Sequence, residues 1–111
     1  MPFFGTVRPP NADHPLCVTL DQLITTAFEI LRDLPPGVEL RRMETLVMHL
    51  SNARRDVAFG FWPDAVRDLD AARNTIVVKR KRNAVRLAIE NLQQRLFELR
   101  PRIVAEVGRP M

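Results

Sequence analysis

The chain has 111 residues, of which 46% are apolar and 27% are charged. This length and composition predict a single folded domain and argue against a multidomain enzyme and against a disordered chain. The net charge of +4 favours anionic partners. Cys17 is the single cysteine, and no stretch has the apolar length of a membrane span. We therefore expect a cytoplasmic protein with no intrachain disulfide and no membrane contact.

The first 18 residues contain four of the nine prolines of the chain and show no helical periodicity. Proline fixes one backbone dihedral angle and lacks an amide hydrogen, so it disfavours the interior of a helix. We therefore predict an extended N-terminal arm over residues 1–18 and one helical domain over residues 19–111.

The first helix is expected to begin at Leu20, because Thr19 and Gln22 have the spacing of a capping box. Apolar residues then recur every three or four positions as far as Leu34. This spacing predicts one buried stripe along an amphipathic helix. The sequence Pro-Pro-Gly at residues 35–37 is expected to end the helix.

The second helix is predicted to run from about Val38 to Phe59, where Gly60 ends it. Pro63 then stands at a position that suits the first turn of a helix. Asp64 complements the positive end of the helix dipole. An apolar stripe follows these two residues, so a third helix is expected to begin there.

From residue 78 onward, apolar residues recur at a spacing of seven and then of alternating four and three, which is typical of a coiled-coil seam. The residues of this seam are Val78, Val85, Ile89, Leu92, Leu96, Leu99 and Ile103. The seam lies on a different face from the stripe of the third helix, and Lys81 and Arg82 would interrupt it. We therefore favour a break between Lys79 and Asn83 over one long helix. Pro101 is expected to cap or kink the end of the fourth helix.

No segment shows the alternating pattern of a strand. Four helices joined by short connections predict an all-α fold, an antiparallel four-helix bundle with an extended proline-containing N-terminal arm. The chain has two histidines, no Glu-x-x-His spacing and no clustered glycines. Neither a metal site nor a phosphate-binding glycine loop is predicted, and we expect no cofactor.

Charge is unevenly distributed along the chain. Residues 1–72 carry 7 basic and 10 acidic side chains, whereas residues 73–111 carry 10 basic and 3 acidic ones. The densest cluster of cations consists of Lys79, Arg80, Lys81, Arg82 and, one turn later, Arg86. Like charges at this density repel one another unless an anion lies among them, so we predict that these residues bind the phosphates of RNA or DNA. No aromatic residue is interleaved with them, which favours recognition of backbone and shape over sequence.

Two other interpretations of the basic cluster stay open. Its cations could meet acidic residues from the first part of the chain and form a solvated corner, or they could bind a protein partner with an acidic face. The preference for arginine over lysine fits bidentate recognition of phosphate. The same preference is equally typical of a GC-rich genome.

A second hypothesis is a protein-interaction or oligomerisation module, such as an adaptor or a regulatory subunit. Two sets of apolar residues could form contacts between chains. They are the aromatic residues Phe59, Phe61 and Trp62 and the seam residues Val85, Ile89, Leu92, Leu96 and Leu99. Either set would place the protein in an oligomer or a larger complex.

A third hypothesis is a small ribonuclease. Arg42 and His49 lie seven residues apart on one face of the second helix, outside its apolar stripe. In this respect the pair resembles the arginine–histidine motif of HEPN-type ribonucleases, which are also small all-α proteins. The resemblance implies that the arginine positions phosphate and that the histidine takes part in acid–base cleavage of RNA. Ser51 and Cys17 lack a nearby base in the sequence, so a non-enzymatic role is favoured overall.

Arg54 and Arg73 each project into an apolar stripe, and a buried arginine must be paired. We expect an ion pair between Arg54 and Asp70, or arginine stems that extend outward to solvent. The functional alternative is a polar groove that binds a ligand.

Four features in chain order carry a resemblance to a known family. They are Leu34-Pro35 after the first helix, a second helix that begins Leu40-Arg41-Arg42-Met43, a basic segment after Leu69, and Ala105-Glu106-Val107-Gly108-Arg109 near the end. In this pattern the chain resembles the four-helix-bundle accessory proteins of diversity-generating retroelements. The resemblance implies a basic, pentameric bundle that associates with a reverse transcriptase and nucleic acid. A non-enzymatic accessory subunit that binds nucleic acid is therefore the leading hypothesis.

Overall fold

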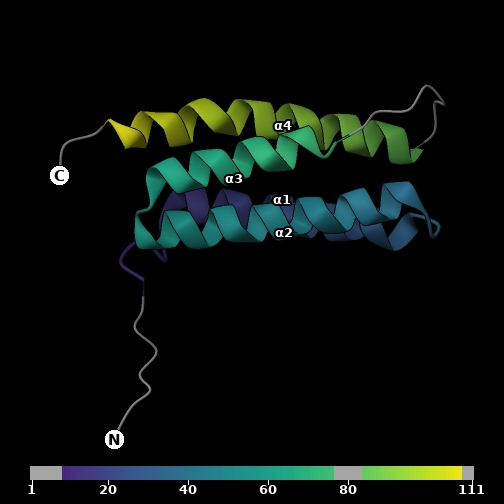
Figure 1. The fold of residues 1–111 in the computed structure, drawn as a ribbon, viewed down its shortest axis with the longest axis horizontal. Helices are drawn as coiled ribbons and strands as arrows, with labels where there is room; N and C mark the ends of the chain where they lie inside the picture. Colours follow the sequence, from purple (N-terminus) through teal and green to yellow (C-terminus); the bar gives the residue numbers. More distant parts are fainter. Residues whose placement is uncertain (1–8, 77–83, 109–111) are drawn as a thin grey trace, which may run out of the picture.

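The computed structural model describes residues 9–76 and 84–108. These residues form α1 (Pro15–Asp33), α2 (Val38–Phe59), α3 (Trp62–Asn74) and α4 (Ala84–Val107), shown in Figure 1. The described ranges contain no strand, so the prediction of an all-α fold is confirmed. None of the helices in these ranges is long and apolar enough to cross a membrane.

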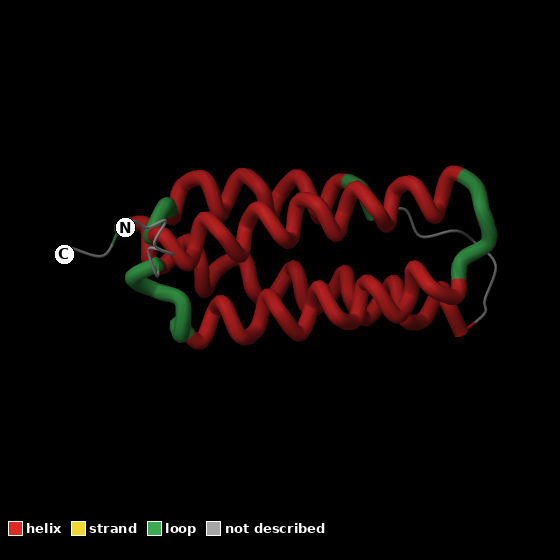
Figure 2. The backbone as a smooth tube through the Cα atoms, turned by 90° about the horizontal axis from the view of Figure 1, so that it is seen from below, coloured by secondary structure: helices red, strands yellow, loops and turns green. Residues whose placement is uncertain are grey.

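The helices lie side by side along the long axis of the molecule (Figures 1 and 2). The second helix contacts α1 and α3, and α4 likewise contacts α1 and α3. Each helix therefore packs against two others, and the buried side chains of all four share one core.

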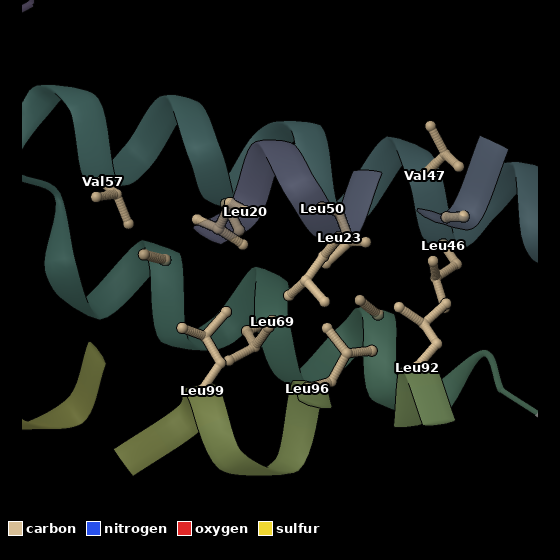
Figure 3. Packing of buried hydrophobic residues seen from close by; sticks show 14 of the residues in the cluster. Leu20, Leu23, Leu46, Val47, Leu50, Val57, Leu69, Leu92, Leu96 and Leu99 are labelled. Atoms are coloured by element: carbon tan, nitrogen blue, oxygen red, sulfur yellow. The ribbon is translucent and has the colours of Figure 1, made fainter. Parts of the chain in front are cut away.

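The core is formed mainly by leucines that point inward from each helix (Figure 3). Its largest fully buried leucines are Leu20, Leu23, Leu46, Leu50, Leu69, Leu92, Leu96 and Leu99. The apolar stripes predicted from sequence spacing are therefore the faces that the helices bury. Burial of such side chains is the dominant favourable term in folding.

The first helix begins earlier than its sequence predicts, at Pro15 instead of Leu20. Proline suits the first turn of a helix because the missing amide hydrogen has no partner there in any case. Nδ1 of His14 accepts a hydrogen bond from the Leu16 amide at 3.0 Å and so caps the helix. The predicted cap at Thr19 is wrong, since its hydroxyl donates to the Pro15 carbonyl inside the first turn at 3.1 Å.

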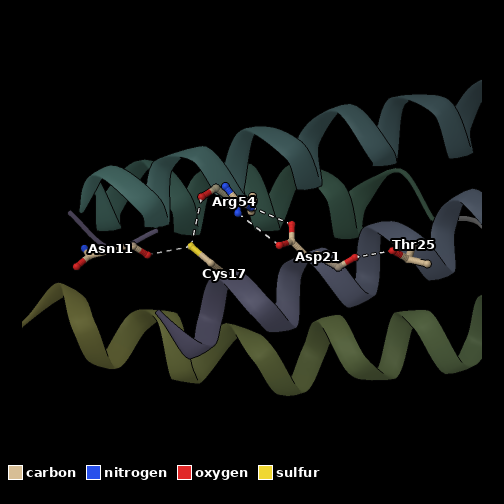
Figure 4. Close-up of polar contacts among 5 residues, drawn as sticks. All are labelled: Asn11, Cys17, Asp21, Thr25 and Arg54. Atoms are coloured by element: carbon tan, nitrogen blue, oxygen red, sulfur yellow. Dashed lines mark hydrogen bonds and ion pairs between the residues drawn. The ribbon is translucent and has the colours of Figure 1, made fainter. Parts of the chain in front are cut away.

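The part of the predicted arm that precedes α1 is tied to the end of α2. The Asn11 amide donates to the Ala58 carbonyl at 2.9 Å, and the Asn11 side chain donates to the Val57 carbonyl at 3.3 Å. The buried Cys17 thiol donates to the Asn11 carbonyl at 3.3 Å (Figure 4). Residues 9–18 therefore belong to the packed structure, and residues 1–8 lie outside the described ranges.

The turn between α2 and α3 follows its sequence signals. Gly60 caps α2 in the left-handed region at φ +79°, a conformation that favours glycine. The next helix begins at Trp62, with Pro63 in its first turn. The predicted end of α2 at Phe59 is confirmed.

The third helix ends at Asn74, with Thr75 as its C-cap, and α4 begins at Ala84. The third and fourth helices are therefore separate, whereas the predicted break between Lys79 and Asn83 and the seam residue Val78 lie outside the described residues. Pro101 does not end α4, which continues to Val107. The helix continues past Pro101 because Ile103, two residues later, is fully buried and packs the last turns of α4 against the core.

Candidate functional site

Most of the predicted phosphate contacts, Lys79 to Arg82, lie outside the described residues. Arg86 is described, and its Nε donates to Oε1 of Glu90 at 2.9 Å across one turn of α4. Its side chain is 26% exposed. Part of the Arg86 charge is therefore neutralised within α4, so a phosphate would have to replace Glu90 to gain its full charge.

Two exposed arginines stand near the start of α2, Arg41 and Arg42. Neither forms an ion pair with a residue in the ranges that the structure describes. Both line an open groove of about 420 Å³, whose other lining residues are Val38, Thr45, Asn74 and Thr75. The chain leaves α3 at this groove and passes into residues 77–83. The same end of the molecule therefore carries the arginines of α2 and the attachment of the basic segment.

Arg42 and His49 both lie on α2. Seven residues correspond to two helical turns, or about 10 Å along the axis of α2. Nδ1 of His49 is buried and has no hydrogen-bond partner among the described residues. Arg42 lines a cavity with Met43 and Ile89 and the open groove with Arg41, and His49 lines neither of these. Cleavage of RNA by this pair therefore stays a prediction from the sequence.

The predicted aromatic contacts lie at the turn between α2 and α3, and we call Phe59, Phe61 and Trp62 the aromatic corner. The rings of Phe59 and Phe61 are stacked with their centroids 6.0 Å apart, and the residues are 39% and 54% exposed. Trp62 is half-buried against the core and meets the His14 ring edge-on at 5.4 Å. Two of the three aromatic residues are therefore available on the surface.

The seam residues predicted to contact a partner are placed differently. Ile89, Leu92, Leu96 and Leu99 are buried in the core of the chain itself, and Val85 packs against that core partly buried. The seam faces α1 and α3 because those helices supply the apolar surface that its spacing requires. Ile89, Leu92, Leu96 and Leu99 are therefore not on the surface of the folded chain, whereas Val85 is partly exposed.

Arg54 is paired, but with Asp21 instead of the predicted Asp70. Its Nε donates to Oδ1 of Asp21 at 2.8 Å and its Nη2 to Oδ2 at 3.4 Å (Figure 4). Asp70 accepts from Nε of Arg100 at 2.7 Å and from Arg73 at 3.5 Å. The hydrogen bond from Arg100 holds the pKa of the Asp70 carboxyl below its usual range. The error arose because Arg54 faces α1, whereas Asp70 faces α4.

Asp56, near the end of α2, is a buried acid that the sequence analysis did not single out. It is 5% exposed, and its Oδ2 has no hydrogen-bond partner in the described part of the chain. Burial first, and then a hydrogen bond with Asp68 and the charge of that carboxyl, raise the pKa of Asp56 to about 7. Asp64 raises this pKa further, and Arg55 lowers it. Asp56 therefore keeps its proton to a higher pH than an exposed aspartate does.

A polar groove lies between the end of α3 and the middle of α4, and we call it the α3–α4 groove. It has a volume of about 350 Å³ and is lined by Arg73, Asn74, Glu90, Gln93, Gln94 and Phe97. Phe97 is 59% exposed, and the guanidinium carbon of Arg73 lies 5.4 Å from the centre of its ring. The sequence analysis did not identify this groove. The signal that could have indicated it is the spacing of Gln93, Gln94 and Phe97, which places these residues on one face of α4 outside the seam.

The described residues include no group of three or more histidine, cysteine or acidic side chains that could hold a metal ion. Comparison with models of protein families, with curated proteins and with solved structures finds no match to this chain.

Proposed function

We propose that this protein is a non-enzymatic accessory protein that binds nucleic acid through its basic segment, Lys79 to Arg86, within a larger complex. The observation that carries the proposal is the uneven charge of the sequence. Residues 73–111 hold ten basic and three acidic side chains, whereas residues 1–72 hold an excess of acids. A basic segment on a small folded body is the electrostatic footprint of phosphate binding.

The exposed arginines of α2 support this proposal. Arg41 and Arg42 line the groove at which the chain enters residues 77–83. Because they form no ion pair with a described residue, a phosphate that reaches them displaces no carboxylate. They would extend the charged surface beyond the basic segment to a second helix.

The architecture we propose is an antiparallel four-helix bundle. Each helix packs against two others, and short connections join α1 to α2 and α2 to α3. Such a bundle is a rigid support for a charged segment. The resemblance to the accessory proteins of diversity-generating retroelements favours a homo-oligomer and a reverse-transcriptase complex as the setting, and the single cysteine favours the cytoplasm.

The proposal is tested by fluorescence anisotropy with labelled single-stranded and double-stranded DNA and RNA at several salt concentrations. The affinity should fall by roughly 0.7 to 0.9 log units per log unit of salt for each phosphate bound. Changing Lys79, Arg80, Lys81 and Arg82 together to alanine should remove most of this dependence. Arg32→Ala, which changes an exposed arginine on α1 outside residues 73–111, serves as the control. The proposal would be overturned by an affinity that does not depend on salt concentration. It would also be overturned if the variant with all four substitutions kept the affinity of the wild type.

A second candidate function is a protein-interaction module, favoured by the exposed stack of Phe59 and Phe61. Exposed aromatic residues are enriched where proteins bind one another. Sedimentation of the wild type and of Phe59→Ser with Phe61→Ser separates the candidates. Self-association that disappears in the double variant supports the module, whereas a monomer in both cases removes homo-oligomerisation through this corner.

A further inference from the structure

The α3–α4 groove combines three kinds of side chain that bind the bases of nucleic acids. It offers an exposed phenyl ring, a guanidinium group and three carboxamides, in Phe97, Arg73 and the set Asn74, Gln93 and Gln94. Aromatic rings and guanidinium planes stack on bases, and carboxamides donate to and accept from base edges. From the sequence we predicted contacts to phosphate only, because no aromatic residue is interleaved with the cations of the basic segment.

The aromatic part of the groove is accessible. Phe97 is 59% exposed although it lies in the middle of a packed helix. Arg73 lies over its ring at 5.4 Å, and its bond to Asp70 is long, at 3.5 Å. Asp70 is already held at 2.7 Å by Arg100. Arg73 can therefore move to cover a base without leaving the carboxylate unpaired.

The acid in the groove does not oppose a nucleic acid. Glu90 accepts from Arg86 at 2.9 Å, so its charge is partly neutralised when the phosphates are bound by Lys79 to Arg82 and Arg86 stays on Glu90. A carboxylate that remains hydrogen-bonded in this way can still accept from the amino group of a base. The remaining lining charge, on Arg73, attracts phosphate.

The position of the groove connects it to the basic segment. Asn74 is the last residue of α3, and Glu90 lies in the second turn of α4. The chain between these two helices is the segment that carries Lys79 to Arg82. Because the chain joins this segment to both helices that line the groove, we expect a strand bound to the segment by its phosphates to be long enough to bring a base to the groove.

We propose that the α3–α4 groove binds an unstacked base of a single-stranded nucleic acid, with Phe97 and Arg73 stacking on the base and Asn74, Gln93 and Gln94 bonding to its edge. This inference rests on the proposed function and adds to it a preference for single strands. The bases of a duplex are stacked on one another and cannot enter the groove.

The test compares a single-stranded oligothymidylate with a chain of abasic sugar phosphates of the same length, by anisotropy at one low salt concentration. Stacking on an aromatic side chain contributes roughly 1–3 kcal/mol per base, so the wild type should prefer the probe with bases by roughly 5- to 150-fold. In Phe97→Ala this preference should fall to nearly one, whereas the affinity for the abasic chain stays unchanged. Phe97→Trp should restore the preference.

Phe28→Ala is the matched control, because Phe28 is 53% exposed on α1 and does not line the groove. It should keep the preference of the wild type, and circular dichroism should show the same helix content in every variant. An equal affinity of the wild type for both probes overturns the base subsite and leaves the phosphate binding standing. A preference that Phe97→Ala retains overturns it as well.

If neither probe binds, the proposed function fails and a second measurement decides the inference. Thymidine has a base and no phosphate, so it tests the groove alone. Titration with thymidine should shift the side-chain amide signals of Asn74, Gln93 and Gln94 in NMR spectra of the wild type but not of Phe97→Ala. Signals that stay in place in the wild type overturn the inference.

Discussion

At the turn between α2 and α3, acidic side chains are crowded around a buried carboxyl, whereas near the start of α2 two arginines are exposed. Asp56 is buried beside Asp68 and Asp64, while Arg41 and Arg42 face solvent. Crowded charge is tolerated in an interior when one group takes up a proton. On a surface it is tolerated because water and ions screen it. The two ends of α2 should therefore respond to different variables, one to pH and the other to salt.

The largest expected effect is at the acidic end. Since the pKa of Asp56 is raised from 3.8 to about 7, the folded protein binds a proton that the unfolded chain has released. This contribution to stability is complete below pH 4 and is lost as the pH rises to about 7. The loss is on the order of a few kcal/mol, because it accumulates over the pH range between the two pKa values.

Asp56→Asn keeps the shape of the side chain and removes its charge, so it should abolish this loss. Urea unfolding should give similar stabilities for the variant and the wild type near pH 4 and a more stable variant at pH 8. Asp21→Asn, at an exposed carboxylate, should leave the pH dependence in place. A wild type whose stability is flat between pH 4 and 8 would show that Asp56 does not titrate as proposed.

A smaller change is expected from Asp68→Asn. Burial is the first cause of the raised pKa of Asp56, and Asp68 is the second. The variant should therefore lower that pKa without returning it to 3.8, so stability is lost over a narrower range of pH. NMR titration of the Asp56 carboxyl measures this directly. An unchanged midpoint would assign the whole shift to burial.

An intermediate effect on stability is expected from the ion pair between Arg54 and Asp21. Its side chains are partly exposed, at 36% and 53%. Partly exposed ion pairs contribute about 0.2–1 kcal/mol. A double-mutant cycle with Arg54→Ala and Asp21→Ala should give a coupling energy in this range that decreases with added salt. A coupling energy of several kcal/mol would mean that the pair is shielded from solvent.

The smallest effect on stability is expected at the basic end. Arg41→Ala with Arg42→Ala should change the free energy of unfolding by less than about 0.5 kcal/mol, because exposed substitutions away from special features usually do so. The same variant should lower the slope of nucleic-acid affinity against salt by roughly 0.7 to 0.9 for each phosphate that it no longer binds. A less stable variant with an unchanged slope would reverse the distinction between the two ends.

Helix positions could be predicted from the sequence because they depend on spacing within one segment. The leucines from Leu46 to Leu50 and from Leu92 to Leu99 mark their buried faces without knowledge of a partner. The start of α1 was missed because an imidazole cap at His14 and a proline at the first position compete with a standard capping box. Apolar spacing and capping signals within one segment therefore predicted where the helices lie, but they predicted the start of α1 less accurately.

Features that depend on which helices are neighbours could not be predicted in the same way. Asp56 stands three residues after the buried Ala53 and directly before the buried Val57, but its burial follows from the approach of α3. The partner of Arg54 and the α3–α4 groove also depend on packing between helices. The seam of α4 is the clearest example of a feature that sequence spacing does not decide. The same spacing is compatible with a contact to another chain and with a contact to α1 and α3.

The bond network at Asn11 makes Cys17 a reporter of local opening. The thiol is buried beneath the segment that Asn11 ties to α2, and burial raises its pKa. An alkylating reagent therefore reaches the sulfur only in molecules in which the first turn of α1 has separated from α2. Because the chain has no other thiol, the rate of alkylation measures how often this segment opens, and no mutation is needed.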